Sequence, residues 1–248
     1  MLPTSFLSKI IEPNATVIDV GARDGDSLLP ILPILKEGSH IIAFEPIKKE
    51  FDKLIKTLTE YNIPENQFTC NQFAIDSETG EADFLYDTED RNGGLKDKLN
   101  SVLKRAYENT KFKTQSQWNQ ELIVQCFCWK DLKEDLKNKM TKASFIKVDT
   151  EGSDIVVLKE LLPVIKKSRP FILFEWYPGT EKEFFLFLKE NHLVVLNVPH
   201  EVPFFSSDMK TVVMGYEVPL GKLSYRKDVF VAPLEKYKNL KKLCSTTH

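Results

Sequence analysis

The stretch that decides the fold is VIDVGARDGD, at positions 17–26. An apolar run contains Asp19 near its end, glycines follow at positions 21 and 25, and further acids stand at positions 24 and 26. Apolar residues that run directly into glycines are typical of a buried strand followed by a tight turn. The negative charge gathered at this strand end predicts a loop that holds a ligand carrying positive charge.

Length and composition describe a globular protein without an extreme overall charge. The chain has 248 residues, of which 42% are hydrophobic, so it can bury a substantial core. A net charge of −2 argues against a basic nucleic-acid binder, and the sequence has no apolar run long enough to predict a membrane span. The first residues lack the features of a secretory signal, so we expect a cytoplasmic protein.

Seven short apolar runs alternate with segments of helical period. Runs without polar alternation are typical of strands covered on both faces, and their alternation with helices predicts an α/β fold with a doubly wound, mostly parallel seven-stranded sheet. The strands are expected at 16–22, 40–46, 67–75, 143–150, 170–176, 193–198 and 228–233. The helices are expected at 48–62, 153–167 and 180–192, with Ser153 as an N-cap.

Four of the expected strands carry acids at or near their carboxyl ends, namely Asp19, Glu45, Asp149 and Glu175. Ligands of open α/β sheets bind at these ends. Glu45 stands 20 residues after Gly25, where a carboxylate can accept hydrogen bonds from both hydroxyls of a ribose. The first two strands therefore predict a site for a nucleoside cofactor.

The first loop distinguishes between two nucleoside cofactors. A dinucleotide site has the pattern G-x-G-x-x-G, whereas the loop from Gly21 to Asp26 lacks one glycine and adds two acids, which repel pyrophosphate. Acids suit the ammonium and sulfonium groups of S-adenosylmethionine, so we favour this methyl donor over NAD. Asp24 and Asp26 could instead cap a helix that begins near Ser27.

Five motifs of the chain, in order, resemble those of the FkbM-type methyltransferases, which are S-adenosylmethionine-dependent enzymes of the Rossmann-like class. The motifs are VIDVGARDGD, IIAFEP, NQFAIDSETGEADF, SFIKVDTEGSDIVVLKEL and PFILFEW, and the match runs from about 16 to 197. IKVDTEG is the most specific, because the family typically carries Lys-(Ile/Val)-Asp-x-Glu-Gly there. The chain departs from the family at Arg23 and Asp24, where members usually have Asn and an apolar residue.

The chain has no internal repeat and no low-complexity linker, which indicates one domain, 1–248, with a core at about 16–233. Two strand-like segments around a long polar stretch break the alternation and indicate an inserted lid or hairpin at about 81–129. The resemblance implies a class I methyltransferase fold. It also implies a set of cofactor-binding residues. These are Asp19, Gly21, Ala22, Arg23, Asp24 and Gly25 around the methionine end, Glu45 at the ribose, Pro46 and Ile47 beside the adenine, Phe73 and Ala74 on its other side, and Asp149 near the methyl group.

Three acids are candidates for catalysis, namely Asp149, Glu151 and Glu175. We expect Asp149 or Glu151 to orient an acceptor hydroxyl and to remove its proton, with Glu175 as a third acid at the same rim. Alternatively, Asp149 contacts only the amino group of the donor, and Glu151 is simply an acid in the first turn of the next helix. A divalent metal could polarise the hydroxyl, but no His stands beside these acids, and we expect none.

FkbM-type relatives methylate mainly oxygen, so the expected acceptor is a hydroxyl on a sugar or other small natural product. The basic segment 88–120 would be a lid for an anionic or glycosidic acceptor, or else a solvated polar insertion. A nucleic-acid acceptor is disfavoured by the overall charge. Two other function classes stay open: an inactive binding protein with a methyltransferase fold, and an NAD-dependent oxidoreductase.

Overall fold

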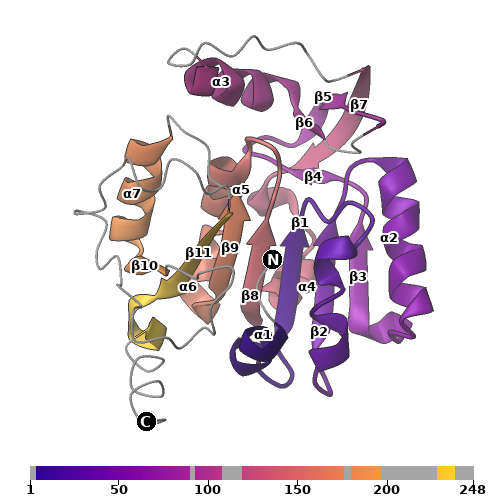
Figure 1. The fold of residues 1–248 in the computed structure, drawn as a ribbon, viewed down its shortest axis with the longest axis vertical. Helices are drawn as coiled ribbons and strands as arrows, with labels where there is room; N and C mark the ends of the chain where they lie inside the picture. The colour runs from indigo at the N-terminus through magenta and orange to yellow at the C-terminus, as the bar shows by residue number, and fades with distance from the viewer. Residues whose placement is uncertain (1–3, 90–92, 108–118, 176–179, 197–227, 238–248) are drawn as a thin grey trace.

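A computed structural model describes residues 4–89, 93–107, 119–175, 180–196 and 228–237. All seven predicted strands lie in one sheet with the order β10-β11-β9-β8-β1-β2-β3 (Figure 1). The strands are β1 (Thr16–Val20), β2 (His40–Phe44), β3 (Phe68–Asn71), β8 (Ala143–Val148), β9 (Phe171–Glu175), β10 (Leu193–Leu196) and β11 (Asp228–Pro233). The first five are parallel, and β11 runs antiparallel to β9 and β10, so the predicted fold class is confirmed.

Helices cover both faces of this sheet because its strands are apolar on both sides. Val17 packs into one core with α1 (Thr4–Ile10) and α2 (Lys48–Glu60). Ile18 faces the opposite core, which is built with α4 (Glu134–Met140), α5 (Asp154–Glu160), α6 (Leu162–Ser168) and α7 (Glu181–Glu190). Among the helices of the described residues, none has both the length and the apolar character needed to cross a bilayer.

Prolines explain two differences from the expected helices. The segment after β1 forms short 3-10 turns at Asp26–Leu28 and Leu32–Ile34, because prolines at positions 30 and 33 cannot donate the backbone bonds of a regular helix. The single helix expected at 153–167 is divided into α5 and α6, and Pro163 stands in the first turn of the second.

A second, four-stranded sheet is inserted into the chain and has the order β4-β7-β5-β6. Its strands are β4 (Ala74–Ile75), β5 (Gly80–Tyr86), β6 (Gly93–Leu95) and β7 (Gln120–Phe127), and α3 (Lys96–Tyr107) follows β6. The strand expected at 67–75 is therefore wrong as one element, because its end pairs with β7 in the second sheet. The inserted sheet and α3 lie over the carboxyl ends of the main strands (Figure 1).

Candidate active site

A cavity of about 260 Å³ opens at the carboxyl ends of β1, β2, β8 and β9, where the acidic strand ends predicted a ligand. The main sheet supplies one part of its wall, including Glu45, Lys147 and Asp149. The inserted sheet supplies another part through Phe84, Tyr86, Gly93 and Leu95. The cavity is thus enclosed jointly by the main and the inserted sheet.

Glu45 follows β2 and is held in the cavity wall by the main chain. Its carboxylate accepts hydrogen bonds from the backbone N–H of Arg23 at 2.9 Å and of Ile47 at 2.8 Å. The side chain is almost fully buried, and burial raises its pKa to about 7, although both backbone bonds act in the opposite direction. Each oxygen has a further lone pair with which to accept a ribose hydroxyl.

Gly21 brings the first loop against the end of β8. It has a φ of 79°, and a Cβ built on it would lie 1.9 Å from the carbonyl oxygen of Asp149. Any larger residue would push these two segments apart. Gly25, with a φ of 83°, packs instead against Leu54 of α2 and does not line the cavity, so its glycine serves the contact with that helix.

Asp19 lies beneath the cavity wall rather than in it. Asp19 and Lys147 face each other in the parallel register of β1 and β8, with Lys147 Nζ 3.4 Å from Asp19 Oδ1. The hydroxyl of Ser27 donates to the other carboxylate oxygen. Burial raises the pKa of Asp19, while Lys147 and Ser27 lower it. Because Asp19 is held in an internal ion pair, the argument that its carboxylate faces a sulfonium does not hold.

The acids of the first loop are paired within the loop itself. Arg23 lies 3.4 Å from Asp24 and also forms an ion pair with Asp26. Arg23 and Asp26 line the cavity, whereas Asp24 and Ala22 do not. Arg23 therefore partly balances the negative charge of this loop. The assignment of S-adenosylmethionine as the cofactor then depends more on the motifs shared with the FkbM-type family than on these acids.

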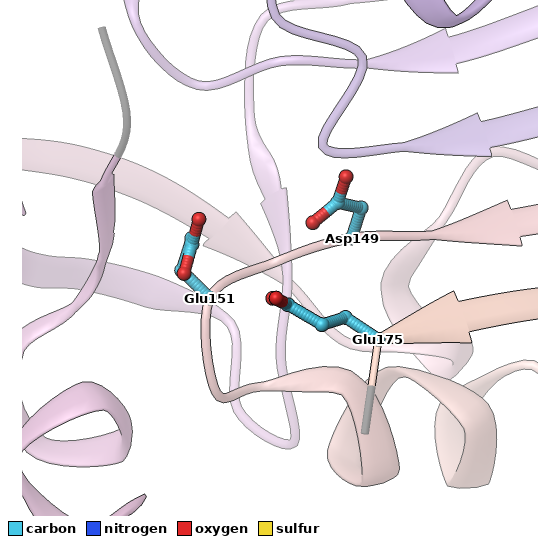
Figure 2. Close-up of side chains that lie close together, drawn as sticks. All are labelled: Asp149, Glu151 and Glu175. Carbon is cyan, nitrogen blue, oxygen red and sulfur yellow. The ribbon is translucent and has the colours of Figure 1, made fainter. Parts of the chain in front are cut away.

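Three carboxylates converge at the other end of the cavity. Figure 2 shows Asp149 after β8, Glu175 at the end of β9 and Glu151 on the loop after β8, with their carboxylates gathered around a common space. One oxygen from each lies within 4.8 Å of the others. Oxygen ligands of this kind suit hard divalent cations, so the group could hold a metal as well as accept a proton. The expectation of no metal stays a prediction.

The loop that carries Asp149 and Glu151 is fixed by Asp154. The Asp154 carboxylate accepts hydrogen bonds from the backbone N–H of Gly152 at 3.2 Å and of Thr150 at 3.4 Å. Burial, followed by the charge of Asp149, raises the pKa of Asp154 to about 7. Ser153 stands at the N-cap position of α5, as predicted, but its side chain makes no capping hydrogen bond.

The predicted adenine-flanking residues Pro46, Ile47, Phe73 and Ala74 all line the cavity. Phe73 also packs on Phe44 and Phe127, with ring centroids 5.5 and 4.5 Å apart. These rings make this part of the wall apolar and rigid, which suits the face of a nucleobase.

Glu50 and Tyr86 were missed by the sequence interpretation, although both line the cavity. The Tyr86 hydroxyl in β5 donates to the Glu50 carboxylate in α2 at 2.9 Å. Lys147 was also missed as a site residue. An acid and a lysine alone in two neighbouring apolar strands could have indicated their pairing, because buried charges need partners.

The insertion reaches the acidic end of the cavity through β6. A Cβ built on Gly94 would lie 2.7 Å from the carbonyl oxygen of Glu151. Of the segment predicted as a lid, residues 90–92 and 108–118 lie outside the described part of the chain, as do Phe112 and Trp118. The described part contains β6 and α3, and the lid role stays a prediction.

Comparisons with known proteins identify a family for this chain. A family model for the methyltransferase FkbM domain matches residues 19–199, more than half of the chain. Among solved structures, methyltransferase FkbM from Methylobacillus flagellatus KT has 15% identity and a TM-score of 0.42, over 69% of this chain and 39% of that one. The chain thus spans well under half the length of that protein.

Two further structures cover more of the chain. A putative methyltransferase from Streptococcus mutans, in complex with SAH, has 10% identity and a TM-score of 0.41, over 92% of this chain and 94% of that one. A SAM-dependent O-methyltransferase from Thermotoga maritima has 11% identity and a TM-score of 0.43, over 92% and 63%. No curated protein matches the sequence. By the family match, which confirms the resemblance of its motifs, this chain belongs to the methyltransferase FkbM domain family.

Proposed function

We propose that the chain is an S-adenosylmethionine-dependent methyltransferase that methylates a hydroxyl oxygen on a sugar or other small natural product. The observation that carries the proposal is one cavity with two chemically different ends. Glu45 is presented at one end by two backbone N–H groups, and three carboxylates converge at the other. The family match supports the reaction class.

The donor would lie along the ends of β1 and β2. The carboxylate of Glu45 would accept the two ribose hydroxyls, and the adenine would pack between Ile47 and Phe73. Gly21 and Arg23 line the cavity next to this position and would contact the methionine end. Asp19, Ala22, Asp24 and Gly25 would shape the loop from behind, because they do not line the cavity.

S-adenosylmethionine supplies the activated methyl carbon. The acceptor oxygen would attack this carbon in line with the carbon–sulfur bond, whose electron pair returns to sulfur to leave S-adenosylhomocysteine. Asp149 or Glu151 would orient the acceptor hydroxyl and take up its proton. Glu175 is almost fully buried beside them and would hold the acceptor or share the proton.

The insertion would close the acceptor end. β6 passes directly over Glu151, and Phe84, Tyr86 and Leu95 give the wall an apolar character. We keep the prediction that the basic part of the insertion covers an anionic or glycosidic acceptor in a cytoplasmic enzyme.

Binding of the donor tests the proposal first. Calorimetry should find S-adenosylmethionine and S-adenosylhomocysteine binding at about micromolar levels, with NAD much weaker. Tight binding of NAD alone would indicate an oxidoreductase and would sink the proposal.

Transfer of a labelled methyl group separates an enzyme from a binding protein. The purified chain is incubated with labelled donor and an extract of its own host, and the product that gains the label is identified. Asp149→Asn should reduce transfer about a hundredfold while donor binding changes little. Donor binding without any transfer would favour the inactive binding protein.

A further inference from the structure

Lys147 is a cation in the floor of the cavity that connects its two ends. The residue lies within β8, its side chain is only 16% exposed, and it lines the cavity. Its Nζ lies 3.4 Å from Asp19 Oδ1 and 3.2 Å from Asp149 Oδ2. One ammonium group thus joins a carboxylate beneath the donor end to a carboxylate at the acceptor end.

Burial of an ammonium group must be compensated by its surroundings. Burial alone lowers the pKa of Lys147, but the charges of Asp19 and Asp149 raise it above its usual range. The lysine therefore stays charged, and it is not a candidate for the base.

The two partners of Lys147 differ in exposure. The Asp19 side chain is 1% exposed, whereas that of Asp149 is 43% exposed and faces the cavity with Glu151 and Glu175. Neutralisation of the buried Asp19 does not require Lys147 to contact Asp149 as well. Lys147 contacts Oδ2 of Asp149, so Oδ1 would be the oxygen that meets an acceptor hydroxyl.

The position of Asp149 also depends on charge. Its carboxylate shares a small space with those of Glu151 and Glu175, and like charges at this distance repel one another. The attraction of Lys147, whose Nζ lies 3.2 Å from Asp149 Oδ2, opposes this repulsion. The lysine is therefore placed to hold this carboxylate against the repulsion of the other two.

We propose that Lys147 is a positioning residue for methyl transfer, whose ammonium holds the carboxylate of Asp149 at a fixed place relative to the donor pocket floor at Asp19. This inference rests on the proposed function. It predicts that Lys147 controls the rate of transfer through Asp149, separately from its contribution to folding.

A comparison in the Asp19→Asn background removes the folding contribution. Lys147→Met alone leaves Asp19 buried without a cation and is expected to unfold readily, whereas Asp19→Asn with Lys147→Met buries no unpaired charge. Transfer of labelled methyl at saturating donor, measured at a temperature at which both variants are folded, should be about a hundredfold slower in this double variant than in Asp19→Asn. Asp19→Asn with Lys147→Arg keeps the cation and should recover most of the rate.

A cycle with Asp149→Asn tests whether the lysine acts through Asp149. In the Asp19→Asn background, Lys147→Met should slow transfer only where Asp149 is intact, and should add little once Asp149 is Asn. Equal slowing in both backgrounds, or none in either, would overturn the proposal.

A binding measurement needs no acceptor. The ratio of affinities for S-adenosylmethionine and S-adenosylhomocysteine reports the charge near the sulfonium, and it should rise several-fold when Lys147→Met is added to Asp19→Asn. An unchanged ratio of the two affinities would contradict a position of the Lys147 ammonium between the donor end and the acceptor end of the cavity. Failure of the unsubstituted chain to bind either compound would refute the proposed function itself, which is a different result.

Discussion

Glu45 and Asp19 are buried carboxylates at the ends of neighbouring strands, yet the molecule holds them in opposite ways. Glu45 is bound by two backbone N–H groups and lines the cavity. Asp19 is bound by two side chains, Lys147 and Ser27, and lies beneath the wall. A carboxylate held by backbone N–H groups can still face a ligand, whereas a carboxylate paired with a buried cation is neutralised inside the protein. The strand end alone does not distinguish the two.

The largest effect is expected on the free energy of unfolding when Asp19 is replaced by Ala. Asp19→Ala leaves Lys147 buried with Asp149 as its remaining partner, and we expect a loss of about 3 kcal/mol in the free energy of unfolding. Urea denaturation measures it. The matched control is Asp52→Ala, which breaks the exposed pair with Lys48 and should cost at most about 0.5 kcal/mol. Equal losses would show that the buried pair contributes nothing special.

Glu45→Gln should instead act mainly on the donor. The amide keeps the shape but can no longer accept from both backbone N–H groups, and it loses the charge that the ribose hydroxyls would meet. We expect affinity for S-adenosylmethionine to fall about ten- to a hundredfold in calorimetry. Glu60→Gln, at an exposed pair on α2, is the control and should leave affinity unchanged.

Because the pKa of Glu45 is raised to about 7, the affinity for the donor should depend on pH. Ribose hydroxyls donate to the ionised carboxylate, so binding favours the ionised form and releases a proton. Donor affinity should therefore rise by about tenfold from pH 6 to pH 8. The rise should disappear in Glu45→Gln. An identical rise in that variant would assign it to another group.

The folding contribution of Glu45 follows the opposite direction. Because its pKa is raised above the unfolded value, the ionised form is disfavoured in the folded protein. The stability that this group contributes is complete at low pH and is lost as the pH rises through about 7.

The smallest effect is expected from the side chain of Arg23. Its side chain is 30% exposed and pairs with Asp24 and Asp26 of the same loop, whereas its backbone N–H binds Glu45. Arg23→Ala keeps that N–H, so the free energy of unfolding should change by less than about 1 kcal/mol. Donor affinity should change by less than about fivefold. A loss as large as that of Glu45→Gln would mean that the guanidinium contributes as much to donor binding as the Glu45 carboxylate does.

The strands and the place of Glu45 in the cavity wall could be predicted because they depend on local pattern. Apolar runs identify the seven strands, and the position of Glu45 after the second follows from spacing. The ion pair of Asp19 could not be predicted, because it depends on the register of β1 and β8, which sets Lys147 beside Asp19. The chain also passes from one sheet to the other between Asn71 and Ala74, and this follows from pairing with β7 rather than from the residues themselves.

The hydrogen bond between Tyr86 and Glu50 limits how the cavity could open. It fastens the inserted sheet to α2, and β5 is also paired with β7 along seven residues. A movement of the whole insertion would have to break this buried contact, whereas, within the described part of the chain, β6 pairs with β5 at three positions. A substrate would therefore enter and leave at the lowest cost through a displacement of β6 and α3, while β5 and β7 stay in place.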